Sequence, residues 1–202
     1  MSSTLSTRLM PISIIILYLS ILAWIFPIFR QYRCNIFYFF LILGISDPLA
    51  VVYVKTIHSS PVYISVVFAP LLFYSVNIDR QKKFTITPLE ISVFILTAVL
   101  LLTISNLDII MLIIHTLVLI RIIFKILIEL HHKQIINIFH LVLAFYMTTS
   151  VASLIIFLNG DHQAIILFYI NLAFQILLAI FFASFRENHP KLIYNVTPVF
   201  KD

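Results

Sequence analysis

Apolar residues fill most of the chain in long runs, and short polar segments separate each run from the next. Most runs reach about 18 to 25 residues, enough for a helix to cross a hydrocarbon core of roughly 30 Å. The pattern predicts an all-α fold: a polytopic membrane protein built as a seven-transmembrane-helix bundle. The predicted spans are residues 11–29, 34–54, 61–76, 88–105, 107–127, 135–158 and 164–185, and residues 186–202 are predicted to form a short cytoplasmic tail.

Local signals mark several of the predicted helix ends. Thr87 is a candidate N-cap, and Pro88 follows it at a position where a helix tolerates proline. Asn106 predicts a turn or cap before the fifth span, and Asn159-Gly160-Asp161 predicts a turn before the seventh. No linker long enough to separate two domains is visible, so residues 1–185 are expected to form one transmembrane domain.

Composition supports the membrane class. Hydrophobic residues make up 62% of the chain and charged residues 10%, against about 45 to 50% and about 25% in ordinary globular domains. A single cysteine, Cys34, excludes an internal disulfide. The formal charge of +5 would suggest nucleic acid only if it clustered on a soluble surface. The basic residues lie at span ends instead, so the expected partner is the lipid bilayer and not nucleic acid.

The basic residues also test the number of spans, because cytoplasmic loops are enriched in Lys and Arg. Nine lie on one predicted side and two, Arg8 and Lys55, on the other. This split predicts an outside N-terminus and an inside C-terminus, for a multi-pass protein of a plasma or cytoplasmic membrane. The nine are Arg30, Arg33, Arg80, Lys82, Lys83, Lys133, Arg186, Lys191 and Lys201.

Asp47 and His115 are predicted to lie in the outer half of the membrane. Pro48 removes a backbone hydrogen bond to the Gly44 carbonyl and is expected to kink the second span beside Asp47. A buried acid near an imidazole would make a proton-titratable or cation-binding site, provided that the two side chains face each other. The alternative is a structural hydrogen bond that locks two helices together.

The inner half of the membrane is predicted to hold a second polar group, formed by Glu90, Arg121, Lys125 and His140. One hypothesis is an Arg121–Glu90 bridge between the fourth and fifth spans. The alternative is that the two cations extend toward the membrane surface and that Glu90 serves its own helix N-terminus. Neither His131 nor His132, at the end of the fifth span, predicts a metal site.

Two further polar features have open roles. Asn171 and Gln175, one turn apart on the seventh span, are predicted near mid-membrane, where they either cap an inward-facing cavity gated by the Arg121–Glu90 bridge or bond to a neighbouring helix. In the tail, residues 192–200 alternate enough to predict a short strand that would add to the sheet edge of a protein partner.

No motif of the common enzyme classes is present: the sequence has no Gly-x-Ser-x-Gly, no His-Glu-x-x-His and no Gly-rich phosphate loop. Pro27, Pro48 and Pro70 mark the first three spans, whereas the last three contain no proline. In architecture the chain resembles the seven-helix input regions of bacterial sensor kinases, and it also resembles small three-plus-one-plus-three sugar transporters, although without the matching prolines that an internal repeat would show.

These observations favour a non-enzymatic sensor, anchor or accessory subunit that acts through a membrane or cytoplasmic protein partner. The alternative is a transporter of a small solute, or a proton-coupled one, that uses Asp47 and His115. No catalytic residue, metal or cofactor is expected.

Overall fold

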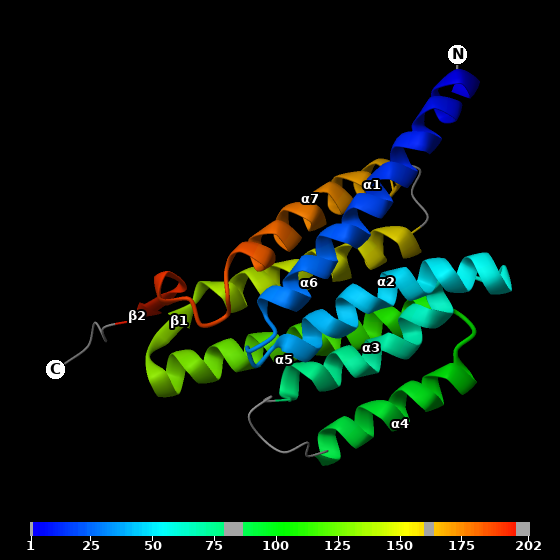
Figure 1. Ribbon diagram of the computed structural model, residues 1–202. Helices are drawn as coiled ribbons and strands as arrows, with labels where there is room; N and C mark the ends of the chain where they lie inside the picture. The colour runs from blue at the N-terminus through cyan, green and yellow to red at the C-terminus, as the bar shows by residue number, and fades with distance from the viewer. Residues whose placement is uncertain (1, 79–86, 160–163, 197–202) are drawn as a thin grey trace.

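The computed structural model describes residues 2–78, 87–159 and 164–196, with side chains from residue 15 onward and, in the last segment, from residue 170. Within these ranges the chain is all-helical apart from two short strands (Figure 1). The predicted basic loop at Arg80, Lys82 and Lys83, the Gly160-Asp161 turn and residues 197–200 of the predicted strand lie outside the described residues. The helices are α1 (Ser2–Arg30), α2 (Phe37–Ile57), α3 (Val62–Asn77), α4 (Pro88–Thr103), α5 (Leu107–Lys133), α6 (Ile138–Leu158) and α7 (Ala164–Ser184).

The helices occupy the predicted apolar segments, and two predicted caps are confirmed. The Glu90 carboxylate accepts hydrogen bonds from the Thr87 amide and hydroxyl, which closes a capping box at the start of α4. The Asn106 side chain accepts the Asp108 amide at 3.0 Å and caps α5. The largest differences are that α1 begins at Ser2 and that α5 continues to Lys133, beyond the predicted apolar runs.

An aromatic core holds the centre of the bundle together. Trp24 of α1 lies 4.8 Å from the Tyr146 ring of α6, measured between centroids. Phe182 of α7 lies 5.0 Å from both Phe40 of α2 and Phe139 of α6. All five rings are buried. We call these five residues the aromatic layer, because rings from four helices meet there and tie α1, α2, α6 and α7 together.

Gly44 allows α1 and α2 to approach closely at the edge of this layer. A Cβ atom at position 44 would lie 2.7 Å from Ile28 Cδ1 and 2.8 Å from the Trp24 carbonyl oxygen. Both distances are shorter than van der Waals contact, so glycine is required for this spacing. Gly44 and Pro48, which lies inside α2 as the sequence predicts, thus shape the helix that carries Asp47.

Helix α4 lies at the edge of the bundle, where it contacts only α3 and α5 closely (Figure 1). Its buried residues are Glu90, Val93 and Thr97, and most of its apolar side chains are exposed; Leu102, for example, is 88% exposed. Among the described residues, α2, α5 and α6 are long and apolar enough to cross a membrane. The fold is therefore compatible with a membrane protein.

The described part of the tail folds back onto the bundle. After a short turn of 3-10 helix (Pro190–Leu192), strand β2 (Ile193–Asn195) pairs antiparallel with β1 (Ile135–Asn137), just before α6 (Figure 1). The predicted strand is thus present at Ile193–Asn195, but its pairing partner belongs to the same chain. The Val196 amide also donates to the Gln134 carbonyl at 2.7 Å, which extends the pairing by one bond.

Candidate functional site

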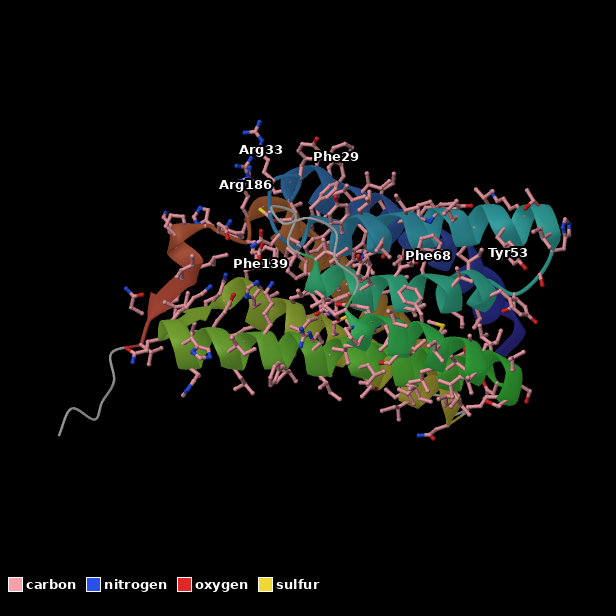
Figure 2. The ribbon with its side chains drawn as sticks, turned by 90° about the horizontal axis from the view of Figure 1, so that it is seen from below. Phe29, Arg33, Tyr53, Phe68, Phe139 and Arg186 are labelled. Carbon is pink, nitrogen blue, oxygen red and sulfur yellow. The ribbon has the colours of Figure 1, made fainter. Side chains whose placement is uncertain are left out.

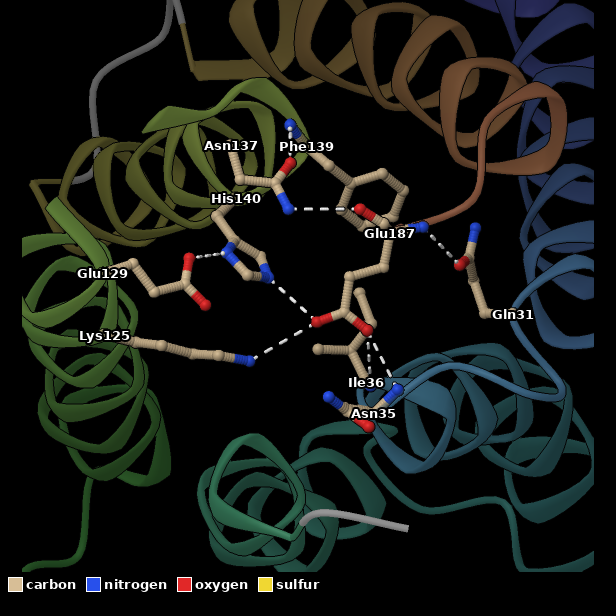
Figure 3. Close-up of polar contacts among 9 residues, drawn as sticks. All are labelled: Gln31, Asn35, Ile36, Lys125, Glu129, Asn137, Phe139, His140 and Glu187. Carbon is tan, nitrogen blue, oxygen red and sulfur yellow. Dashed lines mark hydrogen bonds and ion pairs between the residues drawn. The ribbon is translucent and has the colours of Figure 1, made fainter. Parts of the chain in front are cut away.

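Two polar regions lie in the bundle, and the first is centred on Glu187, three residues beyond the end of α7. One carboxylate oxygen of Glu187 accepts from His140 Nε2 at 3.0 Å and lies 3.6 Å from Lys125 Nζ. The other accepts the backbone amide of Asn35 at 2.9 Å (Figure 3). His140 Nδ1 contacts Glu129 at 2.8 Å. We call Lys125, Glu129, His140 and Glu187 the Glu187 cluster.

The charges of this cluster balance. An ionised carboxylate can only accept hydrogen bonds, so His140 must carry protons on both ring nitrogens to bond Glu129 and Glu187 together. Two cations then face two anions. Burial acts to raise the pKa of Glu187, but the hydrogen bond from His140 and the charge of Lys125 outweigh it, so that its pKa lies below the ordinary value.

Two buried amide side chains connect the same turn to other helices. Gln31, just after α1, donates to the Phe182 and Phe185 carbonyls at 2.8 and 2.6 Å. Its side-chain oxygen accepts the Glu187 amide at 3.1 Å. Asn137 donates to the Glu187 carbonyl, also at 3.1 Å (Figure 3). With backbone and side chain both bonded, the turn after α7 is fixed against the ends of α1, α2, α5 and α6.

The predicted inner network is only partly assembled. Lys125 and His140 both contact Glu187, an acid that the sequence analysis did not single out. Glu90 caps its own helix, and Arg121 Nε donates to the Asn77 side chain, so the proposed Arg121–Glu90 bridge is absent from the described residues. The sequence signal that could have indicated Glu187 is an acidic residue that follows an apolar span and has basic neighbours.

The second polar region is a cavity of about 380 Å³ that we call the Asp47 cavity. Residues of α1, α2, α3, α5, α6 and α7 line it, while the lining contains no residue of α4. Trp24 and Tyr146 of the aromatic layer belong to its wall, and Pro61, Asp108 and Phe157, near helix ends, mark its outermost part.

All four predicted polar residues of the middle and outer layers line this cavity: Asp47, His115, Asn171 and Gln175. Asp47 is exposed within it, and His115 is half-buried. Within the described part of the chain, no hydrogen bond joins Asp47 to His115 and no ion pair neutralises Asp47. The two residues therefore share a cavity without forming the direct structural pair.

Several hydrogen bonds around the cavity leave acceptor atoms in its wall, which also holds the Asn171 and Gln175 amides with both donors and acceptors. His115 Nδ1 lies 2.9 Å from the Met111 carbonyl oxygen, which can only accept, so Nδ1 carries a proton and Nε2 of the neutral ring is an acceptor. Four lining serines donate their hydroxyl protons to backbone carbonyls and keep their oxygen lone pairs: Ser46 at 2.9 Å, Ser65 at 3.5 Å, Ser150 at 3.1 Å and Ser153 at 2.8 Å. Together with the Asp47 carboxylate, this wall suits a ligand that is rich in donors and positively charged.

Comparisons with protein-family models, with curated proteins and with solved structures found no match to this chain. The function of the protein is therefore inferred from the geometry of the two polar regions. Of these, the Glu187 cluster is internally neutral around a buried carboxylate, whereas the Asp47 cavity has space and a carboxylate that no cation neutralises among the described residues. The Asp47 cavity is the candidate binding site.

Proposed function

We propose that the chain is a seven-helix integral membrane protein with its N-terminus outside and its C-terminus inside. The nine-to-two distribution of basic residues supports this orientation. Exposed apolar side chains outside the cavity lining, such as Phe26, Leu102 and Phe145, are suited to lipid contact. In this orientation the Glu187 cluster lies at the cytoplasmic end and the Asp47 cavity in the outer half.

In this proposal the protein acts as a non-enzymatic sensor or accessory subunit that binds a small organic cation in the Asp47 cavity. The observation that carries the proposal is the acceptor-rich wall beside two aromatic rings. Asp47 would supply the counter-charge, and the rings of Trp24 and Tyr146, which both line the cavity, would favour a protonated amine, whose N–H groups can donate to the acceptors of the wall. A volume of about 380 Å³ suits a small ligand.

The route from ligand to partner would run through the packed centre of the protein. Trp24 and Tyr146 belong both to the cavity wall and to the aromatic layer, and Phe139 of that layer directly precedes His140. A cation that displaced the Trp24 or Tyr146 ring would thus press on side chains that hold the tail turn in place. A partner at the cytoplasmic end would detect the change through that turn.

A transporter is the second candidate, and one observation favours it. Helices α1–α3 and α5–α7 both contribute to the cavity wall, while α4 stays at the periphery. This is the arrangement expected of two three-helix units joined by a linker helix. Against passage, the Glu187 cluster and the aromatic layer close the other end of the bundle.

Binding of defined organic cations to the purified, full-length protein tests the proposal. We expect ethylammonium, ethanolamine or putrescine to raise the thermal unfolding midpoint of the wild type, and Asp47→Asn to weaken binding by about tenfold or more, as for loss of a charged hydrogen-bonding partner. Glu90→Gln, which removes one carboxylate outside the cavity lining and keeps a side chain that suits the α4 capping box, is the charge-matched control. Equal binding by wild type and Asp47→Asn would exclude the proposed site.

Uptake measurements separate the two candidates. The cation that binds is added in labelled form to proteoliposomes that contain the wild type. A sensor binds it without accumulation in the lumen. Time-dependent uptake that Asp47→Asn abolishes would establish the transporter instead.

A further inference from the structure

A second cavity, at the opposite end of the bundle from the mouth of the Asp47 cavity, is lined by three arginines. Its volume is about 470 Å³, and it lies between the loop after α1 and the turn after α7. Arg30 and Arg33 come from the loop side and Arg186 from the tail side, more than 150 positions away in the sequence. Figure 2 shows Arg33 and Arg186 side by side, both extending away from the ribbon. We call this the arginine cavity; Cys34, Asn188, His189 and Pro190 complete its lining.

The lining of the arginine cavity offers positive charge and hydrogen-bond donors. A guanidinium group has donors and no acceptor. Arg30 uses one donor on the Ser184 carbonyl at 3.1 Å, while Arg33 and Arg186 make no side-chain hydrogen bond or ion pair within the described residues. His189 Nδ1 accepts the Lys191 amide at 3.3 Å, so the proton of the neutral ring is on Nε2.

Nothing in the lining compensates these charges. No acidic residue lines the cavity in the part of the chain that the structure describes. Glu187, the neighbour of Arg186, is buried and turned into its own cluster, where it already bonds to His140 and to the Asn35 amide. Three guanidinium groups gathered around one space without an acid therefore indicate an anionic ligand from outside the chain, and a planar donor fork suits a phosphate group.

The surface beside the cavity is apolar, which identifies the source of the phosphate. On α1, Leu22, Phe26 and Phe29 follow helical spacing up to Arg30 and are 55%, 61% and 74% exposed. On α7, Leu177 and Ile180 form a similar exposed stripe that leads to Ser184, the residue that Arg30 contacts. A free phosphate ion would not use such stripes, whereas acyl chains would lie along them with the headgroup in the cavity.

We propose that the arginine cavity binds the phosphate headgroup of an anionic phospholipid, whose acyl chains lie along the exposed faces of α1 and α7. Basic pockets at the cytoplasmic ends of transmembrane helices are a general way to hold such headgroups. Bound lipid would neutralise the three arginines and bridge the loop after α1 to the tail turn. This site does not depend on a ligand in the Asp47 cavity.

The test is lipid binding to the full-length protein in detergent, measured by native mass spectrometry and by the thermal unfolding midpoint. Phosphatidylglycerol and phosphatidylcholine with identical acyl chains are compared, and inorganic phosphate is added as a competitor. We expect phosphatidylglycerol to bind in preference to phosphatidylcholine and to raise the midpoint, with inorganic phosphate at millimolar concentration displacing little of it.

Variants locate the binding. Arg33→Gln and Arg186→Gln should each weaken phosphatidylglycerol binding by about fivefold, the usual effect of one basic residue at an anionic surface. The lysine variants Arg33→Lys and Arg186→Lys should retain part of the affinity. Lys191→Gln removes one charge from the same turn but none from the cavity lining, and it should bind like the wild type.

Three results would overturn the proposal. Equal binding of the two lipids would show that charge is not recognised. An equal loss for Lys191→Gln would show a diffuse surface effect. Complete displacement by inorganic phosphate would assign the cavity to a soluble phosphate ligand. If a glutamine variant does not fold in the presence of phosphatidylcholine, the corresponding lysine variant replaces it. A folded lysine variant whose preference for phosphatidylglycerol equals that of the wild type also counts against the site.

Discussion

The Glu187 cluster and the Asp47 cavity both place a carboxylate inside an apolar bundle, and they differ in what surrounds it. The Glu187 side chain is 3% exposed and is bonded to an imidazole, an ammonium group and backbone amides. Asp47 is exposed into a cavity of about 380 Å³ and has no cationic partner among the described residues. The Glu187 carboxylate is thus bonded to groups of the protein itself, whereas the Asp47 carboxylate can bind a ligand.

This difference separates a structural role from a binding role. A buried charge is tolerated when partners replace the water that it loses, and its removal then leaves those partners unpaired. A carboxylate in an open cavity keeps contact with solvent and costs the fold less, so it can be held for a ligand. The two regions should therefore respond in opposite ways to substitution: one in stability, the other in binding.

The largest expected effect is that of Glu187→Ala. The substitution leaves Lys125 and His140 without a counter-charge and the Asn35 amide without its acceptor. Removal of one partner from a buried charge network costs about 3 to 5 kcal/mol. We expect that loss in the free energy of unfolding, measured by reversible denaturation in mixed detergent micelles.

The matched control is Glu90→Ala, which removes another buried carboxylate. Glu90 serves only the capping box of peripheral α4, so its loss should cost about 1 kcal/mol. If Glu187→Ala costs no more than Glu90→Ala, the cluster does not hold the tail turn.

Much of the helical framework was predictable, because each helix coincides with a local apolar run whose ends are marked by capping or turn residues. The capping box at Thr87 and the cap at Asn106 could be read directly, since a cap is formed by residues only two or three positions apart. The four residues predicted for the outer and middle layers also share one cavity. Depth along a helix paired Asp47 with His115, but it did not assign Asn171 and Gln175 to the same cavity.

The Glu187 cluster was not predictable in the same way. Its members come from α5, α6 and the turn after α7, and the bond from Glu187 to Asn35, in the loop before α2, spans 152 positions. Depth places Arg121 and Lys125 in one layer, but which of them meets an acid depends on the rotation of α5 about its axis. In the structure, Arg121 faces Asn77 of α3, and Lys125 faces Glu187.

Gly44→Ala should have the next largest effect on stability. Gly44 lies on α2 between the start of the helix, next to the Glu187-bonded Asn35, and Asp47, so the substitution should affect both regions. The added methyl group would clash with Ile28 and the Trp24 carbonyl. Overpacking of this kind costs about 1 to 3 kcal/mol. We expect a lower free energy of unfolding together with weaker cation binding, because Trp24 also lines the Asp47 cavity. A variant with wild-type stability would show that α1 and α2 can separate freely.

Acidification should affect the Glu187 cluster through the lowered pKa of Glu187. A carboxyl group with a lowered folded-state pKa stabilises the fold above its unfolded-state pKa, about 4.3 for Glu. That contribution disappears as the pH falls through the folded-state pKa. The unfolding midpoint of the wild type should therefore drop more steeply below about pH 4.3 than that of Glu187→Gln. Parallel curves for the two proteins would assign the acid sensitivity to other groups.

Asp47→Asn should have the smallest effect on stability, and this is the result that most directly separates the two regions. The substitution keeps the shape of the side chain, and no ion pair of Asp47 within the described residues is lost. We expect a change of less than about 1 kcal/mol in the free energy of unfolding, typical of a residue without buried partners. The same variant should lose organic-cation binding, as Glu187→Gln should not when assayed under conditions in which it is folded. A stability loss for Asp47→Asn as large as that for Glu187→Ala would mean that both carboxylates hold the fold together, and the Asp47 cavity would then lose its distinction as a binding site.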